Sequence, residues 1–170
     1  MASSTTKKVC VRCSNLQLIP GYASPQTFLR DGGIELLDRN AQARLIPYEQ
    51  VRAVYFVREF EDNPEANQKK VFASRPKSDG LWVRLLFRDG EEIEGLLPND
   101  LLQVENRGYT LTPPDPNTNT QKIFVPRAAL ESLKVLGVIG SPVHRRRPRR
   151  VEPSEDQLEL FRKETSPETQ

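Results

Sequence analysis

The residues best suited to metal or redox chemistry are Cys10 and Cys13, which have the CxxC spacing of zinc and thiol–disulfide sites. The surrounding segment alternates as a strand does, and a strand places residues three apart on opposite faces. The chain also lacks a second Cys/His pair, because His144 is its only histidine and lies beside a run of arginines. A Ser-His-Asp or Cys-His site needs a histidine in the folded part of the chain. We therefore expect no metal, no cofactor and no catalytic residue, and predict that the protein is not an enzyme.

Phosphate-binding loops of the GxxxxGK[ST] or GxGxxG type do not occur in the sequence. Carboxylates are plentiful, but Glu59, Glu61, Glu91 and Glu92 lie in turn or linker contexts. Charged residues in such contexts are typical of a solvated surface. We expect no small-molecule substrate.

A run of arginines near the C-terminus could contact nucleic-acid phosphates and release their counterions. The run consists of Arg145, Arg146, Arg147, Arg149 and Arg150. A solvated linker, partly neutralised by the acidic residues that follow, is the alternative interpretation. The sequence thus makes DNA or RNA phosphates a possible partner of this segment.

The segment Gln157-Leu158-Glu159-Leu160-Phe161 resembles the motif by which bacterial replication and repair proteins dock on the sliding clamp. The resemblance implies an extended peptide, in which Leu160 and Phe161 fill an apolar cleft. Leu158 would seat beside them, and the Gln157 amide would hydrogen-bond at the rim. Alternatively, Ser154 to Gln157 forms a capping box. Leu158 and Phe161 would then share one face of a short helix that packs on the folded body.

The composition indicates a modest core with substantial unfolded chain. Of 170 residues, 36% are hydrophobic and 14 are proline, and the net charge is only +2. Such a charge generates no global field toward nucleic acid. The sequence contains no apolar run long enough for a membrane span and no signal-peptide core at its start. We therefore expect a cytoplasmic protein without a membrane partner.

Two stretches of the chain share a pattern of residues. The distance from Val9 to Gly21 equals that from Val83 to Gly95. Each stretch then has a middle strand, at 33–37 and 108–112, and closes on a proline, Pro47 or Pro126. After each proline, apolar residues follow at the same spacings: Val51, Val54 and Phe56 in the first stretch, Leu130, Leu133 and Val135 in the second. An internal repeat with period-2 alternation predicts two related β units.

Local signals refine this prediction. Asp89-Gly90 between two apolar runs is a strong hairpin signal. Gly21 and Gly95 suggest sharp bends or bulges. The pieces 48–51 and 127–130 could each be one helical turn, and 113–120 reads as a turn-rich insertion.

The predicted fold class is mainly β, with two tandem small Sm-like or SH3-like barrels and a disordered C-terminal tail. The expected boundaries are a disordered N-terminus at 1–7, a first barrel at 8–60, a linker at 61–80, a second barrel at 81–138 and a tail at 139–170. Units of this size are marginal alone, so we expect the two barrels to pack together. The tail is rich in proline and charge, which favours disorder.

The second stretch is similar to the Sm-like or SH3-like small-barrel pattern in its segments 83–90, 94–97 and 123–125. The whole arrangement, with 55–60 and 115–119, also resembles a bacterial domain family of unknown function over about residues 8 to 137. The resemblance implies a fold and no settled activity.

Our first functional hypothesis is a non-enzymatic adaptor that docks on the sliding clamp through Gln157, Leu158, Leu160 and Phe161, with the arginine run adding DNA affinity. The second is a small-barrel module for RNA or single-stranded DNA. A third is a protein-interaction module that adds a strand to a partner. For the second hypothesis, the candidate contacts are Arg30, Arg58, Arg84, Arg88, Lys122 and Arg127, with Tyr22, Tyr109 and Phe124 as stacking faces unless these aromatics pack in the core.

Overall fold

The computed structural model describes residues 6–140 and shows a mainly β protein with two sheets. No α-helix occurs between residues 6 and 140, and within this range no helix could cross a membrane. The predicted clamp-docking residues and the arginine run lie outside the described residues. The strands are β1 (Lys7–Cys13), β2 (Leu18–Ala23), β3 (Leu29–Arg30), β4 (Gly33–Leu37), β5 (Ala43–Ile46), β6 (Val51–Val57), β7 (Gly80–Phe87), β8 (Glu92–Leu97), β9 (Gly108–Leu111), β10 (Thr120–Pro126) and β11 (Leu130–Ile139).

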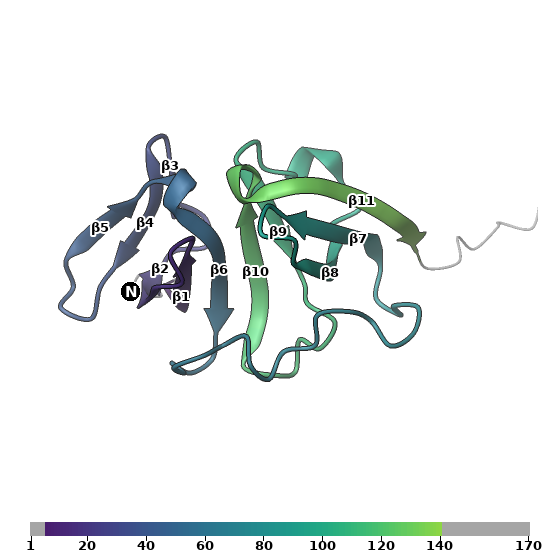
Figure 1. Ribbon diagram of the computed structural model, residues 1–170, viewed down its shortest axis with the longest axis horizontal. Helices are drawn as coiled ribbons and strands as arrows, with labels where there is room; N and C mark the ends of the chain where they lie inside the picture. Colours follow the sequence, from purple (N-terminus) through teal and green to yellow (C-terminus); the bar gives the residue numbers. More distant parts are fainter. Residues whose placement is uncertain (1–5, 141–170) are drawn as a thin grey trace, which may run out of the picture.

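The larger sheet runs through both halves of the molecule. Its order is β3-β4-β2-β1-β6-β10-β9, and β5 pairs with β4 off this path. The smaller sheet has the order β11-β7-β8. Figure 1 shows β1 to β6 on one side and β7 to β11 on the other, with β6 and β10 side by side at the junction. The two halves are therefore joined by backbone hydrogen bonds as well as by side chains.

The strand pairings follow the same order in the two halves. In the first, β1 pairs with β2 and β6, β2 with β4, and β4 with β5. In the second, β7 pairs with β8 and β11, a single bridge links Leu96 at the end of β8 to Thr112 just after β9, and β9 pairs with β10.

The register of these pairings also agrees. Val9 lies opposite Gly21 in the first half, and Val83 lies opposite Gly95 in the second. An irregularity next to Cys13 in the β1–β6 pair has a counterpart next to Leu130 in the β7–β11 pair.

The central strand β6 is buried along its whole length because it lies between two apolar cores. Val54 and Phe56 face a core built with Val9, Val11 and other residues of the first half. Ala53 and Tyr55 face the opposite way, into a core built largely by the second half. A strand covered on both faces is apolar at every position rather than at alternate ones. Six of the seven residues from Val51 to Val57 are accordingly apolar, and Arg52 is the exception.

Of the sharp bends or bulges expected at Gly21 and Gly95, the bulges are wrong. The β1–β2 and β7–β8 registers continue without a shift at both glycines. A Cβ at Gly21 would lie 2.2 Å from the Leu36 Cδ1 atom, and one at Gly95 would lie 2.3 Å from the Leu111 Cδ1 atom. These glycines therefore allow the next strand to pack closely against the sheet.

Three local predictions are confirmed. A hairpin turn joins β7 to β8, with Gly90 in the left-handed region at φ 86°. Single 3-10 turns precede β6 and β11, at η1 (Tyr48–Gln50) and η3 (Arg127–Ala129). The insertion at 113–120 connects β9 to β10, and a third 3-10 turn, η2 (Leu101–Gln103), follows β8. The strands β3 and β5 were not predicted as separate elements.

Candidate functional site

A cleft of about 670 Å³ opens between the two halves and takes residues from both. Its apolar part is formed by buried aromatic rings. Phe28 is packed edge-to-face against Phe56 and against Phe124, with ring centroids 5.4 and 5.3 Å apart. Such packing fixes the rings, and Phe28 and Phe56 contribute to the cleft surface. One side of the cleft is therefore rigid and apolar.

The polar part of the cleft comes from residues in and next to β9 and β10. Thr110 and Lys122 line the cleft, whereas their neighbours Leu111 and Ile123 are buried in the core of the second half. Alternation of side chains along a strand produces this division. Thr112 also lines the cleft. Gln121, the neighbour of Lys122, lines it as well, at the point where the register of the β10–β6 pair shifts.

The cleft contains both signs of charge. Lys7 and Lys122 supply cations, and Asp79 and Glu105 supply carboxylates. Burial raises the pKa of Glu105 above its ordinary value. No histidine lies between residues 6 and 140, and this range holds no group of three or more metal-ligating side chains. The arrangement offers hydrogen bonds, opposite charges and an apolar surface, which are the components of a binding cleft.

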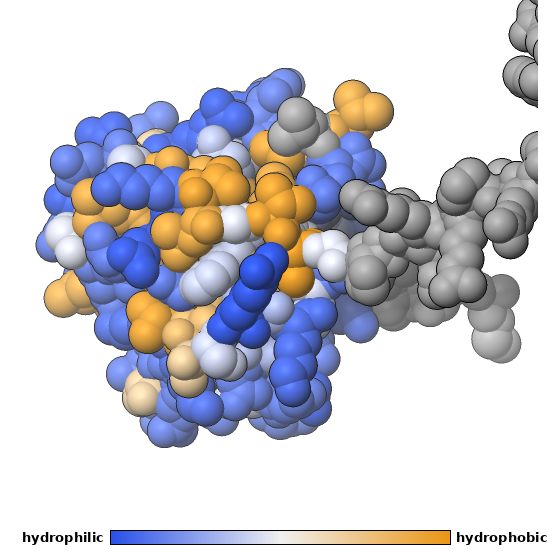
Figure 2. All heavy atoms as spheres, turned by 90° about the vertical axis from the view of Figure 1, so that its right-hand side faces the viewer, coloured by the Kyte–Doolittle hydropathy of each residue, from blue (hydrophilic) through white to orange (hydrophobic). Residues whose placement is uncertain are grey.

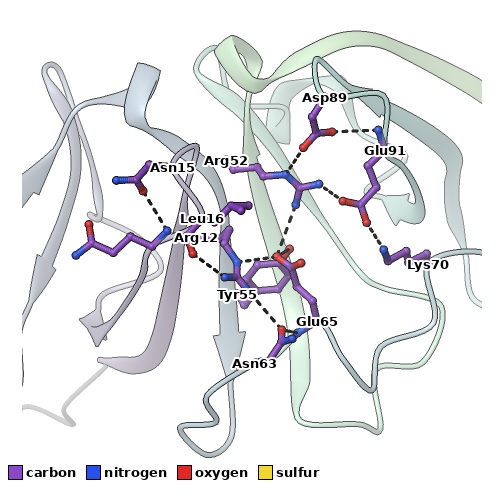
Figure 3. A network of polar contacts seen from close by, with 11 residues as sticks. Arg12, Asn15, Leu16, Arg52, Tyr55, Asn63, Glu65, Lys70, Asp89 and Glu91 are labelled. Atoms are coloured by element: carbon purple, nitrogen blue, oxygen red, sulfur yellow. Dashed lines mark hydrogen bonds and ion pairs between the residues drawn. The ribbon is translucent and has the colours of Figure 1, made fainter.

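A second polar cluster surrounds Arg52, a β6 residue that is only 7% exposed (Figure 3). Its guanidinium lies 4.2 Å from the centre of the Phe87 ring. Its Nε donates to the Asp89 Oδ2 atom over 2.8 Å, and it also forms an ion pair with Glu91. A third carboxylate, that of Glu65, lies 3.6 Å away. Arg52 thus links β6 to the β7–β8 hairpin and to the segment between the halves.

Glu65 extends this cluster toward β1. Its Oε1 accepts hydrogen bonds from the Tyr55 hydroxyl at 2.8 Å and from the Arg12 Nε at 3.2 Å. Burial and the adjacent Glu65 carboxylate raise the pKa of Tyr55 well above its ordinary value. The phenol therefore stays protonated and donates to Glu65. Every carboxylate of the Arg52 cluster has a cation against it, which indicates a structural role.

Glu94 forms a third cluster, on β8, and is 3% exposed. Its carboxylate accepts from the Arg84 guanidinium at 2.7 Å, from the Trp82 indole at 3.1 Å and from the Phe72 backbone N–H at 3.1 Å. Burial alone would raise the pKa of Glu94, but the hydrogen bonds, led by that from Arg84, hold it below its ordinary value. These contacts anchor the segment between β6 and β7, which contains Phe72, against β7 and β8.

The structure changes the interpretation of several predicted nucleic-acid contacts. Phe124 has 0% exposure, so the prediction that it stacks on a base is wrong and its packing in the core is confirmed. Arg84 is held by Glu94, and Arg30 is paired with Glu35 at 2.5 Å.

The other candidates are more exposed. Arg127 lies over the Tyr109 ring at 5.1 Å, and Tyr22 packs edge-to-face on Phe60. Arg58 and Arg88 are exposed, and Lys122 lies in the cleft. Of the predicted contacts that lie within residues 6–140, only Lys122 belongs to the cleft.

The CxxC cysteines face different cores. Cys10 packs with the core of the second half and Cys13 with that of the first. Both are buried free thiols, and burial raises the pKa of each. A protonated, enclosed thiol is a poor nucleophile and a poor metal ligand.

Sequence reasoning did not find the cleft or the two carboxylate clusters. Glu91 looked like a solvated turn residue, yet it pairs with Arg52 and with Lys70. The unusual polar residues inside apolar strands, Arg52 in β6 and Glu94 in β8, were the signals that could have indicated buried ion pairs.

Comparison with known proteins gives a family and no activity. The chain matches no curated protein and no solved structure at a significant level. One family model, described as a family of unknown function (DUF6982), matches residues 5–137. This match covers all strands except the last part of β11, so the chain belongs to that family of unknown function.

Proposed function

We propose that this protein is a non-enzymatic adaptor that docks on the DNA polymerase sliding clamp through its C-terminal segment. The observation that carries the proposal is the sequence Gln157-Leu158-Glu159-Leu160-Phe161. It follows the described body in the chain, since the last strand of residues 6–140 ends at Ile139. A short motif on a separate segment can bind a partner while the body engages something else. The five-arginine run between the two would add phosphate contacts on the DNA that passes through the ring.

We further infer that the body consists of two copies of one small-barrel unit. The shared strand order, the equivalent Val9–Gly21 and Val83–Gly95 pairs and the matching irregularities in β6 and β11 support this inference. In this interpretation β5 corresponds to β10, and β6 corresponds to β11. The cleft then lies where the two units meet, a common position for ligand sites.

The test of clamp docking is calorimetric titration of the full chain into a bacterial sliding clamp. We expect micromolar binding, and we expect the Leu160→Ala/Phe161→Ala variant to lose at least about tenfold in affinity, because apolar anchors dominate such interfaces. The matched control is Val143→Ala/Val151→Ala, which shortens two apolar residues of the same segment outside the motif. Equal binding by wild type and the motif variant would contradict the proposal, as would an absence of binding by wild type.

Nucleic-acid binding by the body is the second candidate, and Lys7 and Lys122 in the cleft favour it. The paired state of Arg30 and Arg84 and the burial of Phe124 weaken it. Titrations with single-stranded DNA at several salt concentrations separate the affinity that comes from the arginine run from the affinity that comes from the cleft. The slope of the logarithm of the binding constant against the logarithm of the salt concentration measures the number of phosphate contacts. Loss of the arginine run should reduce the magnitude of this slope by up to about 0.7 per phosphate contact. A larger loss in the Lys7→Glu/Lys122→Glu variant would instead assign the nucleic acid to the cleft.

A further inference from the structure

Among the strands of the described body that keep one edge without a strand partner are β5 and β11. Between residues 6 and 140, β11 pairs only with β7, and β5 pairs only with β4. An open edge presents unpaired N–H and C=O groups that can hydrogen-bond to another strand. The two open edges belong to different halves of the molecule.

The junction between the halves shows how such edges pair in this fold. There β10 lies antiparallel to β6, with Lys122 opposite Phe56, Ile123 opposite Tyr55 and Phe124 opposite Val54. In the strand order of the two halves, β10 corresponds to β5 and β6 corresponds to β11. The chain therefore pairs β10 with β6 internally. It leaves the corresponding edges of β5 and β11 without a strand partner.

Corresponding residues differ sharply in exposure between the closed junction and the open edges. Phe124 is 0% exposed, whereas Leu45, at the corresponding position of β5, is 55% exposed. Phe56 is 6% exposed, whereas Val135 on β11 is 56% exposed.

The same contrast continues along the strand, since Val57 is 5% exposed and the corresponding Leu136 is 38% exposed. Figure 2 shows apolar residues gathered on the face that lies at the right of Figure 1, where β7, β8 and β11 are drawn. Apolar side chains on an open strand edge mark it as a pairing surface.

We propose that β11 of one molecule pairs antiparallel with β5 of a second copy of the same chain, in the register of the β10–β6 junction. This register places Ala43 opposite Val135, Arg44 opposite Lys134, and Leu45 opposite Leu133. The contact joins different surfaces of the two copies, so it repeats into a closed ring or a filament. The inference rests on the two-unit interpretation of the body and is independent of clamp docking.

The charges in this register determine how the assembly responds to salt. Arg44 and Lys134 lie directly opposite each other, and like charges in that position destabilise a strand pair. Association is therefore weak at low salt and strengthens as salt screens the repulsion. For the same reason, Lys134→Glu replaces repulsion with attraction and strengthens association by about five- to tenfold at low salt. Phosphate binding has the opposite dependence on salt.

Sedimentation velocity over a concentration series tests the interface with the full chain. We expect species larger than the monomer that increase with concentration and with salt. The Val135→Asp variant should remain monomeric, while Val71→Asp, at a site 51% exposed on the segment between β6 and β7, should assemble as wild type does. A wild-type protein that stays monomeric throughout overturns the proposal, and so does assembly of Val135→Asp at wild-type strength. The Leu160→Ala/Phe161→Ala variant should assemble normally, which separates this result from that of the clamp experiment.

Cysteine pairs test the register. Opposed residues of antiparallel strands have Cα atoms about 4.5 to 5.5 Å apart, within the range a disulfide spans. Under oxidised glutathione, a mixture of Ala43→Cys and Val135→Cys proteins should yield a covalent dimer containing one molecule of each. The native Cys10 and Cys13 are buried and add little background. Efficient cross-linking of Val135→Cys with itself would show that two β11 strands meet, and would overturn the β11–β5 contact.

Discussion

The guanidinium of Arg52 is almost enclosed by protein and is surrounded by three carboxylates. Asp89, Glu91 and Glu65 lie around it, and the Phe87 ring lies under it. Breaking a buried ion-pair cluster by removing one partner is strongly destabilising, because the remaining charges lose their counter-ion. The residue thereby determines how firmly the β7–β8 hairpin is held against β6.

The Arg52→Ala variant should be less stable than wild type by about 2–4 kcal/mol, because it loses the ion pairs and the contact with Phe87. Urea unfolding followed by circular dichroism measures the change. Arg88→Ala, which truncates a nearby exposed arginine, is the control and should change stability by less than about 0.5 kcal/mol. A similar loss in both variants would show that the Arg52 contacts are not specific.

Glu94 makes the stability of the protein sensitive to acid. Its pKa is held below the ordinary value of 4.5 in the folded state. A group with a lowered folded pKa stabilises the protein fully above its unfolded pKa, and the contribution disappears as the pH falls through the folded pKa.

Wild type should therefore be more stable than Glu94→Gln at neutral pH, by about 1–3 kcal/mol for the lost charged hydrogen bonds. This advantage should shrink as the pH falls below about 4.5, the ordinary carboxyl value. Urea midpoints measured across this pH range provide the comparison, with the exposed Glu92→Gln as control. A difference that did not vary with pH would contradict the assignment.

At the scale of elements, two glycines let strands approach more closely than any side chain would allow. A Cβ at Gly21 would lie 2.2 Å from Leu36 Cδ1 and 2.6 Å from the Leu37 carbonyl oxygen. Because one of these neighbours is backbone, moving a rotamer cannot relieve the clash. The β2–β4 contact thus depends on the absence of a side chain at this position.

Gly21→Ala should destabilise the fold by about 2–3 kcal/mol or more through overpacking. Gly137→Ala tests the same substitution in an open site, since its nearest neighbour is the Trp82 ring at 3.8 Å. Its effect should stay within about 1 kcal/mol. Thermal unfolding of both variants measures the two losses of stability. Equal losses would mean that strand propensity, rather than the close approach of the next strand, excludes a side chain at position 21.

At the scale of the whole molecule, the two halves share strands and should unfold together. β6 contributes to both cores, and its pairing with β10 carries the sheet across the junction. Each core alone is small, and small cores are marginal. Loss of one core should therefore remove the support of the other.

Phe28→Ala removes a ring from the first core and should cost about 3–5 kcal/mol. Trp82, the only tryptophan, lies on β7 in the second half and reports on that half by its fluorescence. We expect the variant to shift the fluorescence and circular-dichroism midpoints equally. A shift confined to circular dichroism would show that the halves unfold independently.

Local chemistry made part of the fold predictable. Asp89-Gly90 predicted the β7–β8 turn, because a left-handed residue is required there and glycine adopts it readily. The prolines before β6 and β11 predicted single turns at the corresponding positions. Alternation along 9–13 predicted a strand with Cys10 and Cys13 facing opposite sides, and the two cysteines do lie in different cores. These features depend on neighbours in the chain.

The clusters and the cleft could not be predicted in the same way. Arg52 meets Asp89 and Glu91 only because β6 and the β7–β8 hairpin come together in space. Glu94 is recognisable as unusual in an apolar strand, but its partner Phe72 belongs to a connector without regular structure. The cleft combines residues from both halves, so no local pattern announces it.

The sequence by itself determined the mainly β character of the body and its turns, because strand alternation and turn chemistry operate over a few residues. It also carries the similarity between the two stretches and the Gln157–Phe161 motif on which clamp docking is proposed. Only the tertiary structure decided that β6 joins β10, that Phe124 is enclosed, and that β5 and β11 keep open edges. These outcomes depend on hydrogen bonds and packing between segments far apart in the chain, which residue patterns within one segment do not specify.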